Sequence, residues 1–189
     1  NDYEANVSGK WKRGIEKTPS LLYNPNTRGT AQIRCGGGSM AHLSLSLLGP
    51  FQVTLNGEPA TAFESDKVRA LLAYLAVEAD RSHRREKLAD LLWPNRPDQD
   101  ARRNLRYALT NLRQAIGDQQ AIPPFLHISR QTIQFNSASD AWVDVTTFTE
   151  SLAAQTQTVN DMTQAVELYR GEFLEGFSVG DSVPFDEWV

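Results

Sequence analysis

A segment from about Asp98 to Ile116 combines arginines with hydrogen-bonding side chains at helical spacing. At 100° per residue its apolar side chains share one face, which we expect to be buried; they are Ala101, Leu105, Ala108, Leu109, Leu112 and Ile116. The candidate DNA-binding residues lie opposite, and they are Arg102, Arg103, Arg106, Tyr107, Thr110, Arg113 and Gln114. Arginine can bridge guanine or phosphate, while Thr, Gln and Tyr add hydrogen bonds and apolar contacts. This composition is typical of a helix seated in a major groove.

The same face has a second interpretation, as a solvated surface supported by ion pairs between neighbouring side chains. Asp98 lies four residues before Arg102, a spacing that allows such a pair on one helix. Considered alone, the segment leaves both interpretations open. The elements that would have to position this helix therefore decide between them.

Two amphipathic segments precede the basic helix. The first has Ser65 as its expected cap and an apolar stripe at i, i+3, i+4 and i+7, formed by Val68, Leu71, Leu72 and Leu75. The second is short, with Ser82 as its expected cap and Trp93-Pro94 at its end; its stripe is Leu88, Leu91 and Leu92. Gly117 is a natural stop for the third segment. A short helix followed by a longer basic helix predicts a helix-turn-helix.

A hairpin is predicted directly after the helices. The segments Phe125–Ile128 and Thr132–Phe135 enclose Ser129-Arg130-Gln131, and Ile133 is available to the core. Such a hairpin would form the wing of a winged helix. Arg130 at its tip is a further DNA-binding candidate, because it could reach a minor groove or a phosphate.

Alternating apolar and polar residues before the helices predict a small N-terminal antiparallel sheet. Leucines alternate with serines from Leu43 to Leu47, and the pattern resumes from Phe51 to Leu55. Gly49-Pro50 and Asn56-Gly57 are the expected turns. The predicted fold class is therefore α+β, a winged helix-turn-helix with an N-terminal antiparallel sheet.

The charges of the chain are segregated, although the net charge is only −4. Residues 66–135 carry a net charge of +4, and residues 136–189 carry a net charge of −9. A basic block followed by an acidic block indicates two modules with different partners, the first suited to a polyanion.

Other function classes find little support in the composition. No apolar run approaches the length of a membrane span, so we expect no membrane association, and nothing resembles a secretory signal. Cys35 is the only cysteine, which favours a reducing compartment, and we expect a cytoplasmic protein. The three histidines have no metal-ligand spacing, so neither a metal nor a cofactor is expected.

Residues 1–39 differ in composition from the rest of the chain. They lack sustained periodicity and end in Cys35-Gly36-Gly37-Gly38-Ser39, immediately before Met40. A Gly-Ser run beside a methionine is typical of a linker joined to a start codon. We interpret 1–39 as an appended tag or linker; a natural extension is the alternative.

The stretch from Leu43 to Phe135 resembles an OmpR/PhoB-type winged helix. The matching segments are LSLLGPFQVTLNG, KVRALLAYLA, KLADLLWP and ARRNLRYALTNLRQAIGD, followed by the wing. The chain is more closely similar to the SARP (antibiotic regulatory protein) activators, in which a bacterial transcriptional activator domain of tetratricopeptide-like (TPR-like) helix pairs follows. That likeness rests on WVDVTTFTESLA, AVELYRGEFLEGF and FDEWV. It implies a winged helix over residues 40–137 and a truncated activator domain over 138–189.

The resemblance also implies a function. SARP activators bind direct repeats near promoters, insert the third helix into the major groove and recruit RNA polymerase. We therefore expect a sequence-specific double-stranded DNA-binding regulator that is an activator and contacts RNA polymerase, and the question of a homodimer stays open. The acidic segment 136–189 is rich in apolar residues for its length, so we expect it to pack on the winged helix or on a second copy.

Two rival classes are considered. A winged-helix and TPR-like module used only for protein contacts would make the basic face incidental. An enzyme would need a catalytic constellation, and the chain has no glycine-rich phosphate loop and no Ser/His/Asp arrangement in a plausible context. Asp181 and Asp186-Glu187 are better explained by solvation and capping. We therefore expect no catalytic residues.

Overall fold

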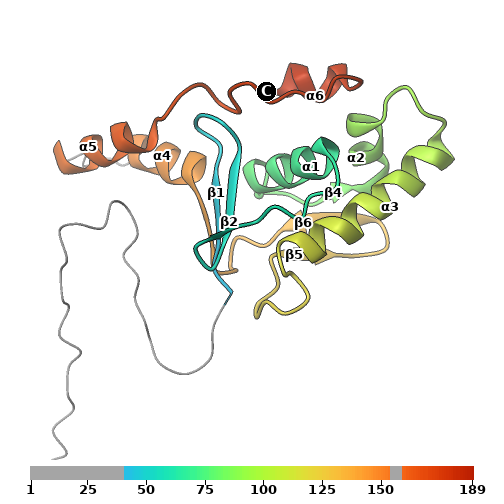
Figure 1. The fold of residues 1–189 in the computed structure, drawn as a ribbon, viewed down its shortest axis with the longest axis horizontal. Helices are drawn as coiled ribbons and strands as arrows, with labels where there is room; N and C mark the ends of the chain where they lie inside the picture. Colours follow the sequence, from blue (N-terminus) through green and yellow to red (C-terminus); the bar gives the residue numbers. More distant parts are fainter. Residues whose placement is uncertain (1–40, 154–158) are drawn as a thin grey trace, which may run out of the picture. The chain divides into compact units, whose positions relative to one another are not determined.

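The computed structural model describes residues 41–153 and 159–189 of the chain. The proposed appended segment 1–39, with Cys35, and the proposed start at Met40 lie outside the described residues. In chain order the elements are β1 Leu43–Ser46, β2 Gln52–Leu55, β3 Glu58–Pro59, α1 Asp66–Val77, β4 His83–Arg84, α2 Arg85–Leu92, α3 Asp98–Ala115, β5 Leu126–Ile128, β6 Thr132–Phe135, β7 Ala141–Val143, α4 Asp144–Ala153, α5 Val159–Leu168 and α6 Val183–Trp188 (Figure 1).

The N-terminal sheet contains the predicted hairpin and one strand that the alternation did not predict. Strands β3, β2 and β1 are antiparallel, with Leu45 opposite Val53. Strand β7 then adds to the other edge of β1 in parallel, with Leu45 opposite Val143. The sheet is therefore mixed rather than wholly antiparallel. With a partner on each side, the backbone of β1 has hydrogen-bonding neighbours along both edges.

The helices follow the predicted apolar stripes. In α1 the predicted side chains of Val68, Leu71, Leu72 and Leu75 are at most 2% exposed. Ser65 does precede this helix as its N-cap residue, but its side chain makes no capping hydrogen bond. The cap predicted for α2 at Ser82 is wrong: Arg84 is the N-cap residue. The physical reason is that His83 and Arg84 are extended, because they pair as β4 with Ile133 and Thr132 of β6.

The wing is a three-stranded sheet in the order β4-β6-β5. Strands β5 and β6 form the predicted hairpin, in which Leu126 lies opposite Phe135 and Ile128 opposite Ile133. Ile133 is fully buried, so the hairpin is anchored in the core. Strand β4 ties it to the residue immediately before α2, and the wing is thereby joined to the helix-turn-helix.

The end of the C-terminal segment packs on the winged helix, as predicted from its apolar residues, whereas Leu152, Val166 and Tyr169 earlier in the segment remain more than half exposed. Leu174 and Phe185 are 1% and 0% exposed. The Ser182 hydroxyl donates a hydrogen bond to the carbonyl oxygen of Leu91 in the last turn of α2. The Trp188 ring meets that of Tyr74 at 5.0 Å between centroids. We call residues 171–189 the strap; it ends in α6, which lies beside α1 and α2 in Figure 1. Helices α4 and α5 contact each other, and their TPR-like nature stays a prediction.

Candidate nucleic-acid interface

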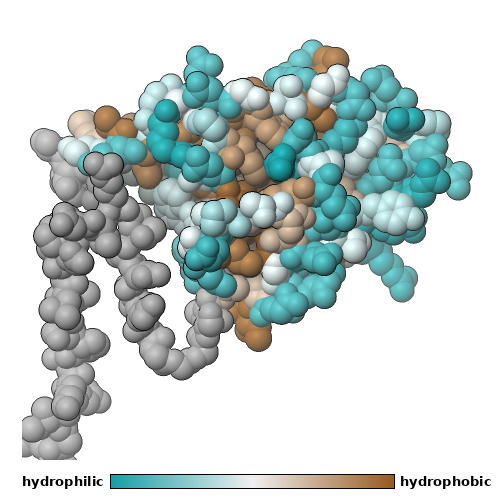
Figure 2. Space-filling view, in the orientation of Figure 1, coloured by the Kyte–Doolittle hydropathy of each residue, from teal (hydrophilic) through white to brown (hydrophobic). Residues whose placement is uncertain are grey.

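Helix α3 presents its two faces as the spacing predicted. Its apolar face packs on α1 and α2, with Leu105 at 1% and Leu112 at 0% exposure. On the opposite face, six of the seven candidate residues are exposed: Arg102, Arg103, Arg106, Tyr107, Thr110 and Gln114. Arg113 is half-buried. The surface around α3 is predominantly hydrophilic on the face drawn in Figure 2. The helix is therefore anchored on one side and open to a ligand on the other.

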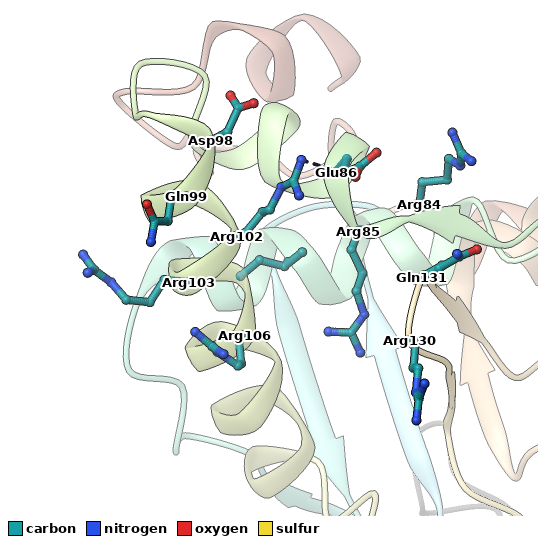
Figure 3. A pocket seen from close by; sticks show the side chains of 11 residues that line it. Arg84, Arg85, Glu86, Asp98, Gln99, Arg102, Arg103, Arg106, Arg130 and Gln131 are labelled. Atoms are coloured by element: carbon teal, nitrogen blue, oxygen red, sulfur yellow. Dashed lines mark ion pairs between the residues drawn. The ribbon is translucent and has the colours of Figure 1, made fainter.

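An open cleft of about 660 Å³ lies between α3, the start of α2 and the tip of the wing. Six arginines line it, namely Arg84, Arg85, Arg102, Arg103, Arg106 and Arg130. The acidic side chains in its lining are Glu86 and Asp98. Figure 3 shows Arg103 and Arg106 on α3, with Arg85 and Arg130 on the facing side. A cleft in which one sign of charge predominates concentrates the electrostatic potential and attracts ions of the opposite sign.

Two of these arginines are already held by carboxylates. Arg102 pairs with Glu86 of α2 at 3.3 Å, and Arg103 pairs with Asp100 at 2.9 Å. The pair suggested by the sequence between Asp98 and Arg102 does not form. Glu86 takes that guanidinium instead, because α2 and α3 pack side by side. Side chains in these pairs are 41–57% exposed, so solvent screens them and each pair is weak.

Arg84, Arg106 and Arg130 are the exposed arginines of the cleft lining that form no ion pair within the described structure. Arg106 and Arg130 lie on the two facing walls. Within the described ranges, no carboxylate oxygen lies within 4.0 Å of either guanidinium. Both side chains are exposed. Their charges are therefore not neutralised by carboxylates within the described structure, which leaves them able to attract a polyanion.

The other candidates on α3 lie away from this cleft. The Thr110 hydroxyl donates to the carbonyl oxygen of Arg106 at 2.9 Å, so it is bonded to its own helix. Arg113 Nε donates to Asp118 Oδ2 at 2.8 Å, and Asp118 Oδ1 accepts from the Leu126 amide at 2.9 Å. Arg113 thus helps to attach the wing to the end of α3. Tyr107 and Gln114 are exposed and line no part of the cleft.

Besides the two carboxylates, four cleft-lining polar residues were not among the sequence candidates: Arg84, Arg85, Gln99 and Gln131. Arg84 and Arg85 could have been noticed in the sequence, because they are consecutive arginines immediately before the apolar stripe of the second helix. A residue there reaches the wing only because β4 pairs with β6. That pairing of two-residue length has no sequence signature.

The comparisons with known proteins agree with this geometry. Residues 64–132 match the family described as "Transcriptional regulatory protein, C terminal". This match runs from the start of α1 to the start of β6 and includes both walls of the cleft. The part of the chain from α1 to the wing is therefore similar to a domain of transcriptional regulatory proteins. The matches are to transcriptional regulators and not to an enzyme family.

Individual relatives support the same assignment. The transcriptional regulatory protein EmbR of Mycobacterium bovis and that of Mycobacterium tuberculosis are each 35% identical to this chain over 75 residues. The aligned part is 40% of this chain and 19% of each relative, so the match spans a small part of their length.

A solved structure shows the same fold. It is titled "Mycobacterium tuberculosis EmbR in complex with low affinity phosphopeptide", and it matches with a TM-score of 0.62 at 23% sequence identity. The match covers 78% of this chain and 41% of that one. Coverage of this extent reaches beyond the winged helix into the C-terminal segment.

Two further features concern the described residues only. In the part of the chain that the structure describes, no helix is both long and apolar enough to cross a membrane. Among the same residues, no group of three or more His, Cys, Asp or Glu side chains could hold a metal ion.

Proposed function

We propose that this protein is a sequence-specific double-stranded DNA-binding regulator that binds the duplex at the arginine-lined cleft. The observation that carries the proposal is the cleft itself, because its lining between α3 and the wing contains six arginines and only two carboxylates. Phosphate contacts from such a surface supply affinity, and contacts with base edges supply specificity.

In the proposed complex α3 lies in the major groove. Arg103 and Arg106 reach base edges or phosphates, and Tyr107 and Gln114 contact the duplex from the exposed face of the same helix. Arg130 of the wing takes the adjacent minor groove or a phosphate. Arg102, Thr110 and Arg113 have closer protein partners, so we assign them smaller contributions.

The wider role follows the resemblance to SARP activators. We propose binding to direct repeats near promoters, activation through RNA polymerase, and action in the cytoplasm. Residues 40–137 would be the DNA-binding domain and 138–189 the start of a TPR-like activator domain, with 1–39 appended.

The proposal is tested by selecting bound fragments from random duplex DNA with the full chain. We expect an enriched motif, and we expect Arg106→Ala to lose it. Arg69→Ala removes the same charge from α1, outside the cleft, and should keep the motif. Failure to enrich any sequence, with folded protein, would instead favour a module that contacts only proteins.

A further inference from the structure

Arg85 connects the start of α2 to the tip of the wing. It is the first residue of α2, and its side chain is partly buried. Its Nε and Nη2 both donate to the carbonyl oxygen of Ser129, at 3.1 and 2.9 Å. Its backbone N–H donates to the carbonyl oxygen of Gln131 at 2.9 Å. The two acceptor residues flank Arg130 at the wing tip, so one residue of the helix-turn-helix holds the turn on both sides.

The turn that Arg85 holds is closed by its own hydrogen bonds. Ser129 Oγ accepts from the backbone N–H of Gln131 at 3.1 Å and from that of Thr132 at 2.8 Å. The Ser129 N–H donates to the Thr132 carbonyl oxygen at 2.9 Å. These bonds fix the shape of the turn, but they do not fix its placement against α2. That placement depends on the short β4–β6 pairing and on the Arg85 side chain.

We propose that Arg85 is a positioning residue, which sets the wing against the helix-turn-helix so that Arg130 and the arginines of α3 reach DNA together. This inference rests on the proposed DNA-binding function. A flat guanidinium can place two N–H groups on one carbonyl oxygen, whereas the lysine ammonium is a point charge on a flexible stem. Prior placement of the wing saves the ordering that binding would otherwise require.

The competing explanation is that Arg85 contacts a phosphate directly. It predicts that replacing Arg85 weakens binding independently of Arg130. It also predicts that Arg85→Lys keeps most of the affinity, because lysine keeps the charge. The positioning role predicts the reverse, because Arg85 then acts through Arg130. A double-mutant cycle separates the two, since coupled residues give non-additive losses.

The experiment measures the affinity of the full chain for a selected duplex in four forms: wild type, Arg85→Lys, Arg130→Ala and the double variant. We expect each single variant to bind about tenfold more weakly, the size of one lost specific contact. The affinity of the double variant should lie within about twofold of that of Arg130→Ala. Once the Arg130 side chain is removed, its position no longer depends on Arg85. Arg69→Lys is the matched control outside the cleft and should bind like wild type.

A second measurement needs no DNA. Amide hydrogen exchange at position 85, whose N–H donates to the Gln131 carbonyl oxygen of the wing, should be several-fold faster in Arg85→Lys than in wild type or Arg69→Lys, because the wing separates from α2 more often. Unchanged exchange would overturn the inference, and so would a double variant about a hundredfold weaker than wild type, the product of two independent losses. If wild type binds no duplex, the proposed function fails, and the exchange measurement still judges whether Arg85 holds the wing.

Discussion

The arginine-lined cleft and the strap of residues 171–189 use their charges in opposite ways. Two of the five acidic side chains of the strap bond within the protein: Asp181 pairs with Lys67 at 2.7 Å, and Asp186 Oδ1 accepts from the Val179 amide at 3.0 Å. Asp144, which is 1% exposed, accepts from the amides of Leu47 and Leu48. In the cleft, Arg106 and Arg130 have no such partner in the described structure.

The difference separates charges that hold the fold from charges that are available to a ligand. Net charge separates the basic block from the acidic block, but it does not show which charges are paired within the protein. Their aromatic content explains the contrast: Phe173, Phe185 and Trp188 drive the strap onto α1 and α2, and its carboxylates are carried into hydrogen-bonding positions. On the exposed face of α3 the only aromatic side chain is Tyr107, and it stays 64% exposed.

The largest expected effect tests the strap as part of the core. Phe185 is fully buried and contacts both Phe177 and Trp188. Phe185→Ala should lower the free energy of unfolding by about 3–5 kcal/mol, because it leaves a cavity. Chemical denaturation measures this loss, and the folded fraction should bind DNA as wild type does. An unchanged midpoint would show that the strap is not part of the core.

Arg106→Ala tests the other side of the comparison. It should weaken binding to a selected duplex by about 1–3 kcal/mol if the guanidinium reads a base. The stability of the protein should stay within about 0.5 kcal/mol of wild type, as for other exposed positions. Fluorescence anisotropy against the selected and a scrambled duplex measures the loss, and equal binding by variant and wild type would remove Arg106 from the interface.

Ser182→Ala tests the polar attachment of the strap. The Ser182 hydroxyl is buried and donates to the Leu91 carbonyl oxygen, while its oxygen accepts from the Phe185 amide at 3.4 Å. Loss of the hydroxyl should lower stability by about 0.5–1.5 kcal/mol, as measured by urea unfolding. A loss of Phe185→Ala size would mean that this hydrogen bond, rather than the aromatic packing, holds the strap.

Glu86→Gln should have the smallest effect, and it should increase binding. The change releases Arg102 from its ion pair and removes one of the carboxylates that line the cleft. We expect duplex binding to strengthen by about 0.2–1 kcal/mol at low salt, the size of an exposed ion pair. Anisotropy at two salt concentrations checks this, and weaker binding would indicate that the pair orients Arg102 for DNA.

Periodicity predicted the elements that are built on local patterns. The stripe from Ala101 to Ile116 placed the buried face of α3 correctly, and the hairpin around Arg130 forms as expected. Of the eight candidate residues, Arg102, Arg103, Arg106 and Arg130 come together around the cleft. Their DNA contacts stay a prediction.

What the sequence could not predict depends on pairing between distant segments. Strand β7 joins β1 across almost a hundred residues, and β4 is two residues long, too short for any alternation to appear. Since β4 displaced the expected Ser82 cap and brought Arg85 to the wing, the missed strand also explains the missed site residue. Side-chain partners such as Glu86 for Arg102 likewise follow from helix packing rather than from spacing on one helix.

The central claim, that the cleft between α3 and the wing holds duplex DNA, is tested most directly by the salt dependence of binding. For the full chain we predict that the logarithm of the binding constant falls steeply and linearly with the logarithm of salt concentration, by about 0.9 for each phosphate neutralised. Arg130→Ala should reduce the slope by about one if it contacts phosphate, whereas Arg69→Ala should leave it unchanged. A flat dependence, or equal slopes for wild type and all six single arginine variants of the cleft, would contradict the account.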